Sequence, residues 1–186
     1  MKLVASFFLI ASLLLVGCST TEKAEYAVGP IKVGNKIDLI DSSIKPICAD
    51  KGCNSFVLSI NNVSEKTIEV NWNKTFFIVG NTTSGGFMFE GIIYKDRNAQ
   101  KSPDVIFPGG SMTKLILPNN LVSFSSGRYG GWTHEFMPTG DIGVFLTVSV
   151  DGRDYSQRMT VNISRQIAQK PAKGPAIVEN KDISKK

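Results

Sequence analysis

Residues 56–72 read Phe-Val-Leu-Ser-Ile-Asn-Asn-Val-Ser-Glu-Lys-Thr-Ile-Glu-Val-Asn-Trp. A large apolar residue stands at every second position in 56–60 and again in 68–72, and the connection 62–66 between them is mostly polar. This period of two is typical of β-strands, whose successive side chains point to opposite faces of a sheet. The stretch therefore predicts two strands joined as an antiparallel hairpin.

Similar segments recur along the chain between glycine- and proline-rich turns. We expect further strands over 76–79, 87–94, 105–107, 112–117, 143–150 and 153–163, and 31–33, 37–40 and 121–124 are additional candidates for short strands. The last two flank Asp151-Gly152, a pair that favours a type I′ hairpin turn because both of its central residues need positive φ. A helical apolar period of useful length is missing between 31 and 164. The sequence predicts an all-β fold, an antiparallel β-sandwich of about seven to nine strands.

The pattern Phe-x-Leu-x-Ile-Asn-Asn followed by Ile-x-Val-x-Trp, within residues 55–164, resembles the immunoglobulin-like domains of many bacterial lipoproteins. The resemblance implies an immunoglobulin-like sandwich and no particular activity. The Cys-Trp-Cys arrangement of antibody domains is absent from the sequence.

The N-terminal segment carries a second resemblance. Residues 3–16 contain fourteen uncharged, mainly apolar residues, which suits a secretory signal and is shorter than the ~20 residues of a transmembrane helix. The run ends in Leu15-Val16-Gly17-Cys18, which resembles the lipobox of bacterial lipoproteins. The resemblance implies cleavage before Cys18 and acylation of that cysteine, which would anchor the chain in a membrane. Ser19 follows in place of Asp, which in enteric-type sorting favours the outer membrane, with the domain facing the periplasm. A cleaved secretory signal with an incidental cysteine is the alternative.

Charge divides the mature chain into a neutral body and a basic end. Residues 18–164 hold 14 Lys and Arg against 14 Asp and Glu, whereas 165–186 hold six against two. We expect a signal peptide at 1–17, an acylated tether at 18–30, a β-sandwich domain at 31–164 and a disordered basic tail at 165–186. The neutral body argues against nucleic-acid binding. The tail is either a solvated end or a contact for anionic lipid, lipopolysaccharide or peptidoglycan.

Two cysteines, Cys48 and Cys53, remain once Cys18 is assigned to lipid. An even pair in an exported chain predicts a disulfide, worth about 2 kcal/mol for so short a loop. The single histidine, His134, is distant in sequence, so we expect no metal site and no cofactor.

The most unusual segment is 125–136, which places Arg128, Tyr129, Trp132 and His134 among several glycines. Tyr, Trp and Arg dominate interface hot spots, and long loops on rigid sandwiches often carry binding. These four residues are therefore the candidate partner-binding site, and Arg97 is a candidate in a second loop.

The simpler interpretation of the same segment is structural. Trp132 and Phe136 would then cap one end of the core, and the glycines would ease the turn.

Catalytic motifs are missing. His134 has no accompanying Gly-x-Ser-x-Gly elbow and no second histidine at zinc-helix spacing, and the carboxylates Glu90, Asp104, Glu135 and Asp141 stand in ordinary contexts. We therefore expect a non-enzymatic outer-membrane lipoprotein that binds another envelope protein as an accessory subunit. The alternatives are a periplasmic glycan- or lipid-binding module, a surface exclusion or defence lipoprotein and, last, a small hydrolase.

Overall fold

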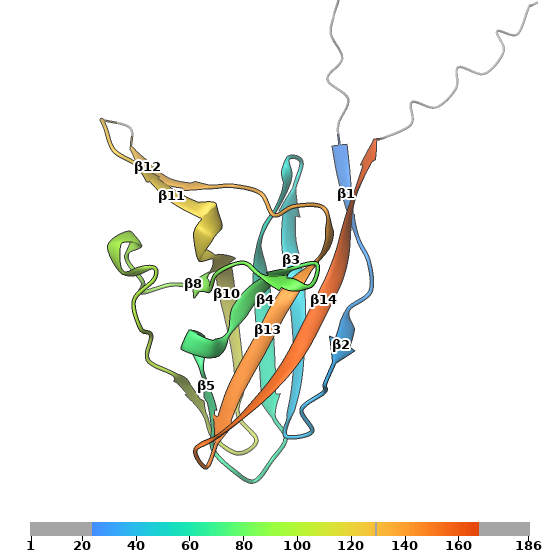
Figure 1. Cartoon of the computed structure of the whole chain (residues 1–186), viewed down its shortest axis with the longest axis vertical. Coiled ribbons are helices and arrows are strands. Elements are labelled where there is room, and N and C mark those ends of the chain that lie inside the picture. The colour runs from blue at the N-terminus through green and yellow to red at the C-terminus, as the bar shows by residue number, and fades with distance from the viewer. Residues whose placement is uncertain (1–23, 129, 168–186) are drawn as a thin grey trace, which may run out of the picture.

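Two antiparallel sheets and a separate two-stranded ribbon make up the computed structural model, which describes residues 24–128 and 130–167 (Figure 1). The eight-stranded sheet contains β1 (Ala24–Val28), β2 (Lys32–Gly34), β5 (Ile68–Val70), β6 (Phe76–Val79), β7 (Thr82–Thr83), β9 (Asp104–Ile106), β13 (Gly140–Val150) and β14 (Arg153–Ile167). The four-stranded sheet contains β3 (Ile40–Ala49), β4 (Gly52–Asn62), β8 (Phe87–Met88) and β10 (Ser111–Pro118). The ribbon pairs β11 (Val122–Ser125) with β12 (Gly131–His134).

The all-β antiparallel sandwich expected from the sequence is confirmed. The described residues form fourteen strands rather than seven to nine, because short strands share long partners. Strands β1 and β2 both pair with β14, and β5 and β6 both pair with β13. Three short 3-10 helices, η1 (Trp72–Lys74), η2 (Tyr94–Asp96) and η3 (Asn119–Leu121), lie in the connections.

The hairpin predicted at Asp151-Gly152 is confirmed. Val150 pairs with Arg153, and the two turn residues have φ of 49° and 73°, as a type I′ turn requires. The resulting β13–β14 hairpin runs the length of the eight-stranded sheet.

The hairpin predicted between 56–60 and 68–72 is wrong. Strand β4 pairs with β3 and β10, whereas β5 pairs with β13 and β9 in the other sheet. Buried Asn62 directs this crossing: its side-chain amide donates to the carbonyls of Lys66 (2.6 Å) and Ile106 (3.0 Å), and its side-chain oxygen accepts from Ser64. The period of two does mark two strands, but these strands turn their apolar faces to one core from opposite sheets.

The core lies between the two sheets. Phe56 of β4 contacts Phe77 of β6 with ring centroids 6.2 Å apart, and Phe77 contacts Phe87 of β8 at 6.3 Å. The apolar residues of β13 and β4 that face this layer are fully buried. Burial of this kind is the main stabilising contribution to the fold.

The folded domain extends beyond the predicted range of 31–164. Residues 24–28, predicted as tether, form β1, which pairs with β14 so that Ala24 lies opposite Ile167. The Tyr26 hydroxyl donates to the carbonyl of Lys51, 3.0 Å away. Backbone pairing thus orders a segment whose polar composition resembles a linker. The lipobox, Cys18 and the tail after 167 lie outside the described residues.

The predicted disulfide between Cys48 and Cys53 is present. It closes the β3–β4 hairpin at a turn where Gly52 has φ of 145°.

Candidate functional site

The β11–β12 ribbon has two chemically different faces. Phe124 pairs directly with Trp132 on one face, and on the other the hydroxyl of Ser123 is hydrogen-bonded to that of Thr133. Side chains alternate between the faces of an antiparallel pair, so the sequence of these eight residues separates an aromatic face from a hydroxyl face. The ribbon projects from one end of the sandwich (Figure 1).

Three rings form a cluster on the aromatic face. Trp132 meets Phe124 with centroids 5.7 Å apart and Tyr94 of η2 at 5.2 Å, both edge-to-face. The Arg97 guanidinium lies 4.0 Å from the Tyr94 ring centroid. We call these four residues, Tyr94, Arg97, Phe124 and Trp132, the aromatic patch. Phe124 is 52% exposed and Trp132 43%, so the rings contact one another while remaining open to solvent.

The segment after η2 is held to the sandwich at two points. Asn73 makes two hydrogen bonds to the backbone of Lys101, receiving its N–H at 2.8 Å and donating to its carbonyl at 2.9 Å. The Asn119 amide donates to the side-chain oxygen of Asn98 at 2.7 Å. These bonds fix the strap 97–103 and, with it, the position of Arg97 beside Tyr94.

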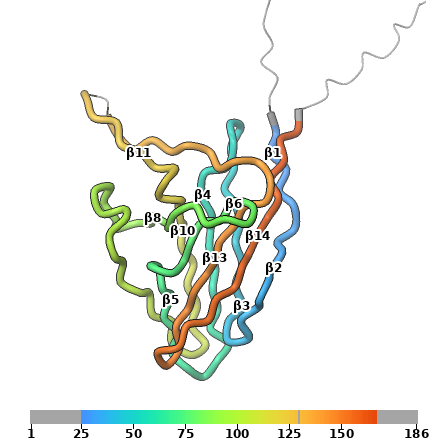
Figure 2. Tube along the Cα trace, in the orientation of Figure 1, coloured from blue at the N-terminus to red at the C-terminus, as the bar shows by residue number. Residues whose placement is uncertain are grey.

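The base of the ribbon is tied to the disulfide hairpin. The backbone N–H of Met137 donates to the carbonyl of Cys53 (2.7 Å), and that of Glu135 donates to the carbonyl of Leu121 (2.8 Å). Phe136 packs directly over Gly52, where an added Cβ would lie 2.8 Å from the Phe136 side chain. The connection from β12 to β13 therefore crosses the end of the sandwich in close contact with it (Figure 2).

The structure places the predicted partner-binding residues as follows. Trp132 belongs to the aromatic patch, and His134 is exposed further down the ribbon, opposite Val122. Arg128 is exposed in the turn between the two strands. Tyr129 lies outside the described residues.

The two rings of the capping interpretation lie in different places. Phe136 packs over Gly52 at the end of the sandwich, as that interpretation expects, and remains 41% exposed. Trp132 is 43% exposed and contacts Phe124 and Tyr94 instead. The glycine-rich turn extends the ribbon away from the sandwich, which removes Trp132 from the interior.

Two members of the patch were missed from the sequence. The sequence predicts a strand over 87–94, but β8 ends at Met88 and Tyr94 lies in η2. Phe124 belongs to the candidate strand over 121–124, and nothing in that pattern distinguishes it from the other strand residues. The signal that could have found Phe124 is its place opposite Trp132, which becomes visible only when 122–125 and 131–134 are aligned as a hairpin.

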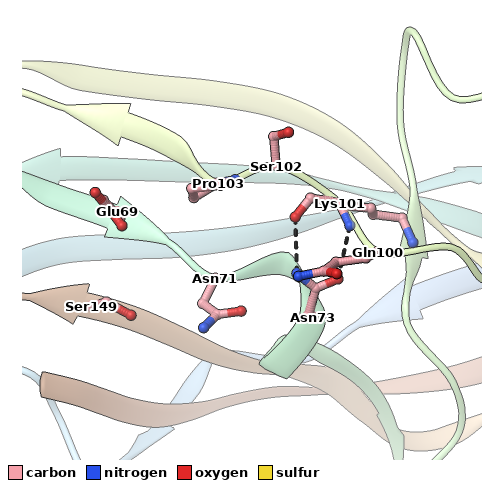
Figure 3. A pocket seen from close by; sticks show the side chains of 8 residues that line it. All are labelled: Glu69, Asn71, Asn73, Gln100, Lys101, Ser102, Pro103 and Ser149. Carbon is pink, nitrogen blue, oxygen red and sulfur yellow. Dashed lines mark hydrogen bonds between the residues drawn. The ribbon is translucent and has the colours of Figure 1, made fainter. Parts of the chain in front are cut away.

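A polar hollow of about 470 Å3 lies against residues 100–103 of the strap (Figure 3). The side chains of Glu69, Asn71, Gln100 and Ser102 line it and make no hydrogen bond to any described residue. Lys101 also lines it, and partial burial lowers the pKa of its ammonium group. These amides and hydroxyls can donate to and accept from a polar ligand.

The carboxylates considered for catalysis have structural partners or stand apart. Asp104 accepts from the indole N–H of Trp72 (2.8 Å) and forms an ion pair with Lys114. Asp141 accepts from the side chain of Asn162 (2.8 Å). Within the described parts of the chain, no three His, Cys, Asp or Glu side chains are grouped closely enough to hold a metal ion.

No protein-family model, curated protein or solved structure matches this chain. Within residues 24–128 and 130–167, no helix has the length and apolarity needed to cross a membrane. The described part of the chain is thus an antiparallel β-sandwich that carries an exposed ribbon with packed aromatic rings at one end.

Proposed function

We propose that this chain is a non-enzymatic, lipid-anchored protein of the bacterial cell envelope that binds another envelope protein through the aromatic patch. One observation carries the proposal: Phe124 and Trp132 are packed against Tyr94, yet each remains about half exposed. Exposed large rings are costly to leave in water, and clusters of them commonly mark interaction surfaces.

The composition and rigidity of the patch both suit a protein partner. Trp, Tyr and Arg are the residues most enriched among interface hot spots. The rings already hold one another edge-to-face, and Arg97 already lies against Tyr94, so little side-chain freedom remains to be lost on binding. A pre-organised patch retains more of its contact energy as affinity.

The anchoring part of the proposal is supported by the lipobox-like Leu15-Val16-Gly17-Cys18. One acyl chain gives only marginal membrane binding, whereas two or more anchor firmly. A triacylated Cys18 would therefore keep the domain at the membrane. Ser19 favours the outer membrane, with the sandwich in the periplasm.

The test is mild crosslinking of the full-length acylated protein in its own membranes, then affinity purification and mass spectrometry. We expect a stoichiometric envelope protein, and we expect Trp132→Ala to lower its recovery at least about tenfold, as loss of a hot-spot residue does. Phe107→Ala is the matched control, because Phe107 is 69% exposed but follows β9 beside Asn62, at the end of β4 away from the disulfide turn and the ribbon. Equal recovery with wild-type, Trp132→Ala and Phe107→Ala proteins would refute the proposal.

A further inference from the structure

The aromatic patch and the chain's point of attachment lie at the same end of the sandwich. Figure 1 shows the start of β1, the end of β14 and the β11–β12 ribbon all at one end. Hydrogen bonds also link β1, through the disulfide turn, to the chain that follows the ribbon. Tyr26 of β1 donates to Lys51 in the disulfide turn, and the adjoining Cys53 carbonyl accepts from Met137 below the ribbon.

The chain available to span the gap to the membrane is short. Six peptide units separate Cys18 from Ala24, the first described residue, so even a fully extended tether reaches only about 20 Å. The opposite end of the sandwich lies further away by the length of β13, about 35 Å for eleven residues. An anchor at Cys18 therefore keeps the ribbon end close to the bilayer surface and turns the Asp151-Gly152 end away from it.

The charge of the C-terminal segment reinforces this orientation. Residues 168–186 carry five Lys and two acidic residues, and they leave the sandwich from Ile167, opposite Ala24. Basic segments next to a membrane are attracted to anionic headgroups. Anchor and tail thus draw the same end of the sandwich toward the bilayer.

We propose that the partner of the aromatic patch is a protein embedded in the membrane that holds Cys18, and that the two meet at the bilayer surface. The inference rests on the proposed function. The tether keeps the ribbon end of the sandwich within about 20 Å of the bilayer surface. The rim of an embedded protein lies at the right height to reach the patch.

The arrangement of the ribbon favours a protein over the lipid itself. The described residues of the turn, Ser126, Gly127 and Arg128, are exposed and carry no ring, and Tyr129 lies outside the described residues. The Phe124 and Trp132 rings face Tyr94 of the sandwich. These two rings therefore form a lateral contact surface, which favours a protein over lipid as their partner.

Photocrosslinking in native membranes tests the inference. A photoreactive amino acid is placed at Phe124 in the full-length acylated protein and, as the control, at Phe107. We expect the probe at 124 to give an adduct with a protein that stays in the membrane after an alkaline carbonate wash. The probe at 107 should give none. Trp132→Ala should abolish the adduct at 124.

A second variant measures the dependence on tether length. Inserting about 20 Gly and Ser residues after Ser19 lowers the effective concentration of the patch at the membrane, so the adduct yield should fall several-fold. A soluble partner would crosslink equally with either tether and would wash off with carbonate. That result would overturn the inference and leave the proposed function standing. An adduct with lipid alone, with a second copy of this chain or with nothing would overturn both.

Discussion

The β13–β14 and β11–β12 hairpins are built by the same local rules and end in opposite environments. Each alternates large apolar residues with polar ones around a glycine-containing turn. In β13, Ile142, Val144, Leu146 and Val148 are completely buried under the second sheet. In the ribbon, Phe124 and Trp132 contact each other and Tyr94 and remain about half exposed.

The difference shows that alternation identifies a strand but not its task. An apolar face stabilises the fold when a second sheet covers it. The same kind of face left open has stability only from its own contacts and is free for a partner. Substitutions in β13 should therefore reduce stability, and equivalent substitutions in the ribbon should reduce binding.

The largest contrast should come from two glycines. A Cβ at Gly143 of β13 would lie 1.9 Å from the carbonyl oxygen of Met159 in β14, whereas a Cβ at Gly131 of β12 meets nothing within 4 Å. Backbone cannot yield to such a clash without separating β13 from β14. We expect Gly143→Ala to cost more than about 3 kcal/mol in the free energy of unfolding and Gly131→Ala almost nothing. Urea denaturation measures both, and equal costs would contradict the comparison.

The next contrast removes one large side chain from each hairpin. Leu146→Ala leaves a cavity between the sheets and should lower the free energy of unfolding by about 3 kcal/mol. Trp132→Ala removes a half-exposed ring and its contacts with Phe124 and Tyr94, and should cost about 1 kcal/mol or less. Thermal unfolding followed by circular dichroism distinguishes them. A large loss of stability in Trp132→Ala would make the ribbon part of the core.

The smallest effect concerns the exposed charges of the β13–β14 hairpin. Hydrogen bonds from Lys74 and then Ser149 lower the pKa of Asp154. Its contribution is present above the unfolded-state pKa and is lost as the pH falls through the lower folded-state pKa. Because the pair is exposed, Asp154→Asn should cost under about 0.5 kcal/mol at pH 7, and the difference from wild type should vanish in acid. A cost that persists in acid strong enough to protonate Asp154 in both the folded and the unfolded state would rule out an electrostatic origin.

The sequence predicts where strands lie better than it predicts which strands pair with one another. The β13–β14 hairpin, the disulfide and the all-β class followed from alternation, turn chemistry and cysteine count. The alternation pattern does not predict most of β3, because Ser42 and Pro46 occupy inward positions where the pattern requires large apolar residues. As an edge strand it tolerates proline, since only one side needs backbone donors.

Half of the aromatic patch could likewise be predicted from the sequence. Residue type singles out Trp132, and its loop singles out Arg97, whereas Arg128, chosen like Trp132, lies exposed in the turn and is not part of the patch. The grouping of Trp132 and Arg97 with Tyr94 cannot be predicted from the sequence, because 30 positions separate Tyr94 from Phe124 and only the fold brings them together. Alternation and turn patterns describe residues that are close in sequence and cannot predict a contact between residues so far apart.

The pairing of Ala24 with Ile167 has a consequence for the evolution of this domain. The folded chain enters and leaves at one place, as in many domains that tolerate insertion and circular permutation. Such a unit can be spliced into a surface loop of a larger protein, or moved from one anchor to another, without altering a strand. The sandwich can therefore be transferred as a unit, and its anchoring segment and its binding ribbon can evolve separately.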